Sequence, residues 1–172
     1  MAWTKYIGQY ILLMILQVFL FDQLQLLGVC NPFIYILFLL MMPITLPHSV
    51  DMFIGAIVGL IMDIFSNSLG VHTSACVLLM FFRPYLLGTI INDKDRLNEQ
   101  ISTRVMGLAA MGKYLAILII IHHFMVFILS AWSWAHIGFV LVETIVSAII
   151  TFIFIFTFFT FILCFSAITY CT

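Results

Sequence analysis

The sequence predicts an all-α integral membrane protein built as a bundle of about six transmembrane helices. Of its 172 residues, 65% are hydrophobic and only 8% are charged, and the mean hydropathy is +1.27. Soluble domains of this size carry far more charge. The apolar runs are long enough for the roughly 20 helical residues that cross a hydrocarbon core. Residues 117–121 and 152–156 are apolar at every position, which excludes the alternating pattern of a membrane β-barrel.

Polar breaks divide this single transmembrane domain, residues 1–172, into apolar runs. The predicted spans are 6–21, 33–46, 50–65, 71–91, 113–130 and 137–162. The second and third are short for a full crossing and are separated by Pro47, which interrupts a helix. We therefore expect these two to tilt or to form one tight hairpin. In the last run, residues 137–168, Glu143 is the only charged residue, so its helix should be longer than a bilayer requires.

The basic residues predict the orientation. Four of the six Lys and Arg residues lie in or beside the polar segment 92–112: Lys94, Arg96, Arg104 and Lys113. The positive-inside rule places such a segment in the cytoplasm. Because four predicted spans precede it and two follow it, both termini are expected in the cytoplasm as well. The net charge of −1 gives no reason to expect nucleic acid as a partner.

Motifs of known chemistry are missing from the sequence. It contains no Gly-x-Ser-x-Gly, His-Glu-x-x-His or Cys-x-x-Cys, and no phosphate-binding loop with a lysine. The four cysteines, Cys30, Cys76, Cys164 and Cys171, show no ligand-like spacing. We therefore predict no catalytic residue, no metal site and no cofactor, and a protein that is not an enzyme.

Two carboxylates in the run 50–65 require a partner or water, because a charge in lipid is costly. Asp51 and Asp63 are twelve residues apart, hence about 18 Å along one helix, and cannot share a site. Both carboxylates cap helix ends at the membrane interface in one interpretation. In the other, Asp51 pairs with Arg83 of the next span and Asp63 pairs with His72. The sequence leaves both open.

A third polar group combines the last two spans. His122 and His123 fall near the middle of the fifth span and Glu143 lies in the sixth. Adjacent helical residues are about 100° apart, so only one histidine can face Glu143. The main interpretation is a His–Glu pair that joins two helices, and the alternative is a path for protons or a metal ion.

Small residues predict a close helix contact. Gly55 and Gly59 are four residues apart and share one helix face, Asp63 continues that series, and Gly70 follows. Such a face lets another backbone approach closely. The neighbour is either a helix of this chain or a helix of a partner.

These residues also carry a resemblance. In chain order they are Asn31-Pro32, Pro47, Gly55, Gly59-Leu60-Ile61, Asp63 and Leu69-Gly70-Val71-His72. This order resembles the rod shape-determining protein MreD family over the central third of the chain, and over the C-terminal half in outline. The resemblance implies a non-enzymatic scaffold in the bacterial inner membrane that serves cell-wall elongation. It implies MreC, RodA with its transpeptidase and, indirectly, MreB as partners, besides membrane lipid, with MreC as the candidate for a partner helix on the glycine face.

The resemblance also suggests rival functions. The MreD family is similar to the six-helix substrate-binding subunits of energy-coupling-factor vitamin transporters, so a small-molecule transporter subunit is the first rival. The first helix of those subunits carries an Ala-x-x-x-Ala motif, whereas residues 6–27 contain no alanine, which favours the scaffold. The second rival is an ion or proton carrier that uses Asp51, Asp63, His122 and Glu143.

Overall fold

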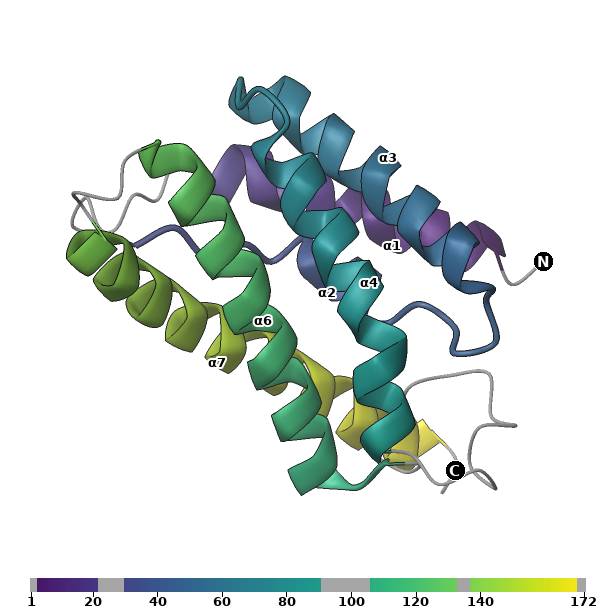
Figure 1. The fold of residues 1–172 in the computed structure, drawn as a ribbon. Coiled ribbons are helices and arrows are strands. Elements are labelled where there is room, and N and C mark those ends of the chain that lie inside the picture. The colour runs from purple at the N-terminus through teal and green to yellow at the C-terminus, as the bar shows by residue number, and fades with distance from the viewer. Residues whose placement is uncertain (1–2, 22–29, 91–105, 133–136, 170–172) are drawn as a thin grey trace.

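The computed structural model describes residues 3–21, 30–90, 106–132 and 137–169 (Figure 1). Within these ranges every regular element is a helix, and no strand forms. The elements are α1 (Trp3–Leu16), a π-helix η1 (Gln17–Phe21), α2 (Ile36–Leu40), α3 (His48–Ser66), α4 (Val71–Ile90), α6 (Leu108–Ala131) and α7 (Ile137–Thr169).

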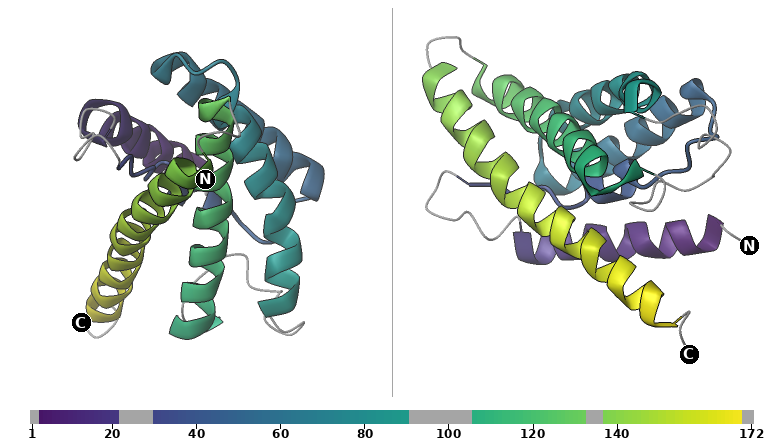
Figure 2. Two further views of the ribbon diagram at one scale, coloured as in Figure 1. Left: turned by 60° about the vertical axis from the view of Figure 1, so that its left-hand side comes forward. Right: turned by 90° about the horizontal axis from the view of Figure 1, so that it is seen from below.

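Four of these helices, α3, α4, α6 and α7, are long and apolar enough to cross a membrane. They pack in chain order, α3 on α4, α4 on α6 and α6 on α7, and successive helices run in opposite directions (Figure 1). Near its C-terminal end α7 diverges from α6, as both views of Figure 2 show. The protein is therefore all-helical in its described part and suited to a membrane, as the sequence predicted.

The expected number of six spans is not reached among the described residues. The predicted spans 50–65 and 71–91 match α3 and α4 within two residues at each end, and α7 begins at Ile137 as predicted. Helix α6 begins at Leu108, five residues before the predicted start at Lys113, so residues 108–112 belong to a helix and not to the polar segment. Residues 92–105 of that segment lie outside the described part.

The prediction of a membrane-spanning helix over 33–46 is wrong, because this segment forms only the five-residue helix α2. Proline explains the short length. Pro32 precedes the segment, and Pro43 and Pro47 follow α2. Each lacks a backbone N–H, and Pro43 disfavours helical backbone angles at the residue before it.

Residues 30–46 nevertheless run through the middle of the bundle. The N–H of Asn31 bonds to Ser147 of α7, and the carbonyl of Met42 accepts from Arg83 in the second half of α4. Between these points the chain is deeply buried: Tyr35, Ile36 and Leu39 have no exposed surface. Non-helical backbone is tolerated at membrane depth only where protein or water satisfies its polar groups. The polar residues of the interior must therefore be considered as partners of this segment, which we call the core segment.

Candidate functional site

Gln17 supports the beginning of the core segment. Its side-chain amide donates to the carbonyl of Pro32 at 3.1 Å, and its carbonyl oxygen accepts from the N–H groups of Ile34 at 2.7 Å and Tyr35 at 3.4 Å. Gln17 is only 1% exposed and is the first residue of the π-helix η1. One side chain thus satisfies three backbone groups that no helix satisfies.

Helix α7 supplies two more partners from a stripe of small hydroxyl residues. Ser147 Oγ accepts from the N–H of Asn31 at 3.0 Å, and Thr151 Oγ1 accepts from the N–H of Phe33 at 3.2 Å. Thr151 Oγ1 also lies 3.0 Å from Nε2 of His123. Ser147 and Thr151 are four residues apart, which is about one helical turn. This spacing places their hydroxyls beside the N–H groups of Asn31 and Phe33 along the core segment.

Substitution of Gln17 by leucine should destabilise the protein strongly. The variant leaves two N–H groups and one carbonyl unpaired in a buried place, where each unsatisfied group costs about 1–3 kcal/mol. We expect a clear fall in melting temperature in detergent, measured by unfolding fluorescence. The matched control is Thr157→Val, because the exposed Thr157 hydroxyl bonds only to carbonyls of its own helix. Equal melting of both variants would show that Gln17 does not hold the core segment.

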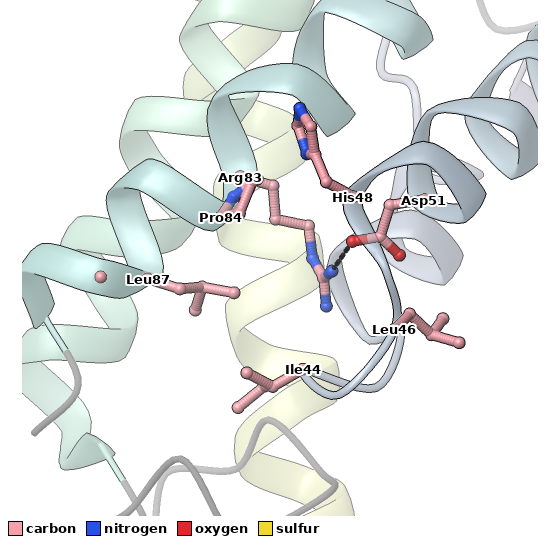
Figure 3. Close-up of a pocket in the computed structure, with 8 residues that line it drawn as sticks. Ile44, Leu46, His48, Asp51, Arg83, Pro84 and Leu87 are labelled. Carbon is pink, nitrogen blue, oxygen red and sulfur yellow. Dashed lines mark hydrogen bonds and ion pairs between the residues drawn. The ribbon is translucent and has the colours of Figure 1, made fainter. Parts of the chain in front are cut away.

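Arg83 holds the other end of the core segment, and Figure 3 shows it beside Asp51. Its Nη1 lies 2.7 Å from Oδ2 of Asp51, its Nε donates to the hydroxyl of Tyr114 at 3.2 Å, and its Nη2 donates to the carbonyl of Met42. The Tyr114 hydroxyl in turn donates to the carbonyl of Leu40 at 3.0 Å. The ion pair expected between Asp51 and Arg83 is therefore present, and it joins α3, α4, α6 and the end of the core segment.

A small cavity of about 210 Å³ adjoins this ion pair. Ile44, Leu46, His48 and Leu87 line it together with the pair (Figure 3). Oδ1 of Asp51 and Nδ1 of His48 have no hydrogen-bond partner among the described residues. A cavity of this size has room for water molecules that would satisfy such atoms.

Tyr35 is the centre of a second polar cluster, which the sequence did not reveal. Its hydroxyl lies 2.8 Å from Nε2 of His122 and 3.1 Å from Nδ1 of His72, with Sγ of Cys76 at 3.5 Å. Nδ1 of His122 is buried and has no partner among the described residues. An unpaired N–H is costlier than an unpaired acceptor nitrogen. We therefore assign the His122 proton to Nε2, so that His122 donates to Tyr35, and Tyr35 donates to His72.

The expected pair of Glu143 with either His122 or His123 does not form among the described residues. His122 bonds to Tyr35, and His123 bonds to Thr151 and to the carbonyl of Ile119. The error has a clear origin, because helix geometry alone gave no sign that a tyrosine from the core segment would lie between the helices.

Asp63 caps the beginning of α4. Its carboxylate accepts from the N–H groups of His72 and Thr73, both at 2.9 Å, from the Thr73 hydroxyl at 2.6 Å and from the Ser68 hydroxyl at 2.7 Å. A carboxylate at a helix N-terminus satisfies free N–H groups and faces the positive end of the helix dipole. The capping interpretation is therefore correct for Asp63. The pairing with the His72 side chain is wrong, since Asp63 meets the backbone of that residue.

Gly55 and Gly59 pack against α4 of the same chain. A Cβ atom on Gly59 would lie 2.4 Å from Cα of Thr73, and one on Gly55 would lie 2.8 Å from Cγ of Met80. The alternative of a partner helix on this face is therefore wrong, because α4 covers it. Gly70, in contrast, is not a packing residue, because no atom would lie within 4 Å of a Cβ added to it. Its φ of +85° suits the turn between α3 and α4.

A larger cavity, about 460 Å³, lies at the end of the bundle where α3 ends and α4 begins. We call it the Glu143 cavity, since this carboxylate of α7 lines it. Gln17, Asn31 and His72 contribute polar surface, and phenylalanine rings contribute much of the remainder. Asn31 and His72, two residues of the motif that are far apart in sequence, thus line the same cavity.

The chemistry available to these groups is limited. Among the described residues, no group of three or more His, Cys, Asp or Glu side chains is arranged to hold a metal ion. The chain of hydrogen bonds from His122 through Tyr35 to His72 reaches the Glu143 cavity, but its inner end is the unpartnered Nδ1 of His122. Within the described residues this chain of hydrogen bonds therefore ends at Nδ1 of His122. Comparisons with protein-family models, curated proteins and solved structures gave no match to this chain.

Proposed function

We propose that this chain is a non-enzymatic scaffold of the bacterial inner membrane that serves cell-wall elongation, like the MreD family that its sequence resembles. In this role it binds MreC and links it to RodA with its transpeptidase, and indirectly to MreB. Both termini face the cytoplasm, as does the polar segment, which now comprises residues 92–107.

The observation that carries the proposal is the structural role of the residues behind the resemblance. Gly59 admits the backbone of α4 at Thr73, Asp63 caps α4 at His72, and Gly70 forms the turn between them. The part of the motif from Gly55 to His72 is therefore one connected unit, the α3–α4 hairpin. A motif that specifies packing supports a relationship in fold, and a scaffold needs a fold more than it needs reactive groups.

The interior polar residues support the same conclusion. Gln17, Ser147, Thr151 and Arg83 all bond to the backbone of the core segment. Their hydrogen-bonding capacity is used to stabilise the bundle. Since α4 covers the glycine face, a partner helix has to bind to an exposed face. Phe53, Ile57, Leu60 and Ile64 form such a face along α3.

The test is purification of the tagged chain from its native membranes in mild detergent, followed by identification of the proteins that accompany it. We expect MreC and RodA, and we expect cells depleted of the chain to lose their rod shape. An unrelated multi-span protein with the same tag is the control. Rod-shaped growth of depleted cells, with neither protein recovered, would contradict the proposal.

A second candidate, the substrate-binding subunit of a small-molecule transporter, is favoured by the Glu143 cavity. Its volume of about 460 Å³ lies within the roughly 300–1,000 Å³ of ligand pockets. The same purification separates the two candidates, because an accompanying ATPase module supports the transporter.

A further inference from the structure

Among the described residues, no positively charged side chain pairs with the carboxylate of Glu143. It lies six residues after the start of α7, about 9 Å along the helix axis. Among the described residues, Arg83 with Asp51 is the only ion pair, and no hydrogen bond reaches Glu143. A carboxylate within an apolar helix is costly unless water or a positive charge meets it. Its position on the wall of a cavity leaves room for either.

The walls beside Glu143 are aromatic. Phe21, Phe33, Phe65 and Phe127 line the same cavity and come from η1, the core segment, α3 and α6. Phe33 and Phe127 are 6% and 5% exposed, and their ring centroids are 6.1 Å apart, so these rings are held in place by packing. The faces of aromatic rings attract cations, and a carboxylate among them adds a full opposite charge.

We infer that the Glu143 cavity binds a small organic ammonium, with its nitrogen at Glu143 and its apolar part among the phenylalanine rings. The volume of about 460 Å³ has room for the whole of such a small molecule. Asn31 and Ser130 line the cavity as well and provide oxygen atoms for further ammonium hydrogens. This inference does not rest on the scaffold role and would hold beside it.

The test uses the full chain in nanodiscs of phosphatidylglycerol alone, with phenethylammonium as the probe and uncharged 2-phenylethanol as its matched control. We expect the ammonium to raise the melting temperature of the wild type and the alcohol to have little effect. Glu143→Gln keeps the shape of the side chain and removes its charge. This variant should bind phenethylammonium at least about tenfold more weakly than the wild type does. That is the loss expected for one charge-assisted hydrogen bond. Thr157→Val, outside the cavity, should bind as the wild type does.

A second arm separates two sources of the ammonium. Nanodiscs that contain phosphatidylethanolamine offer the group as a lipid headgroup. If they stabilise the wild type but not Glu143→Gln, and free phenethylammonium then adds nothing, the lipid is the source. A free amine is the source if the soluble probe still acts. The inference would be overturned if wild type and Glu143→Gln responded equally, or if phenethylammonium and 2-phenylethanol had equal effects. It would also be overturned if neither the soluble probes nor phosphatidylethanolamine changed the melting temperature. In that case water or a basic side chain of a partner would be the group that meets Glu143.

Discussion

Gly59→Leu is expected to unfold the protein, and Gly59→Ala to destabilise it severely. Even the single Cβ of alanine would lie 2.4 Å from Cα of Thr73, 2.8 Å from N of Thr73 and 2.7 Å from the carbonyl oxygen of His72. All three are backbone atoms, which cannot move as a flexible side chain can. Helix α4 must therefore shift away from α3, and Asp63 would lose its bonds to His72 and Thr73. We expect Gly59→Ala to cost about 3 kcal/mol, the upper part of the usual overpacking range.

Thermal unfolding in detergent, together with the yield of monodisperse protein, measures this effect. Gly8→Ala is the matched control, because no atom lies within 4 Å of the Cβ it would add. Alanine also favours a helix interior over glycine by about 1 kcal/mol, so Gly8→Ala should melt at or above the wild-type temperature. If Gly59→Ala melts like Gly8→Ala, α3 and α4 do not approach as closely as the structure has them.

Arg83→Leu should destabilise the protein more than the double change of Asp51→Leu with Arg83→Leu. The single variant leaves the Asp51 carboxylate, 4% exposed in its side chain, without its positive partner. Breaking a buried pair in this way costs about 3–5 kcal/mol, whereas replacing both charges by apolar side chains is often far less costly. Both variants lose the bonds to Met42 and Tyr114, so the difference between them isolates the stranded charge.

Folded yield and melting temperature of both variants check this prediction. Arg83→Lys gives a third measurement. Lysine keeps the charge but has a single ammonium in place of a planar group that bonds to Asp51, Tyr114 and Met42 at once. The melting temperature of Arg83→Lys should therefore lie between those of the wild type and Arg83→Leu. Equal losses in the single and double variants would mean that the ion pair contributes no stability of its own.

The sequence by itself determined the class of the protein and most of its long helices. Spans over 50–65 and 71–91 and the start at Ile137 agree with α3, α4 and α7, because long apolar runs between polar breaks have few other structures in a membrane. The pair of Asp51 and Arg83 was one of the two interpretations that the sequence left open. A charge inside an apolar run requires a partner, and the sequence offers few candidates.

Only the tertiary structure decided what the other polar residues do. Gln17, Tyr35 and Thr151 are polar residues within apolar runs, a visible signal, but their partners lie far away in sequence. Tyr35 takes the position at His122 that was expected for Glu143, and Gln17 bonds to backbone groups at Pro32, Ile34 and Tyr35. Helical spacing relates residues along one helix and cannot place a non-helical segment between several helices. Pro47 indicated a break between two of the predicted spans, but the side chains that satisfy the free backbone groups of the core segment are fixed only when α4, α6 and α7 enclose it.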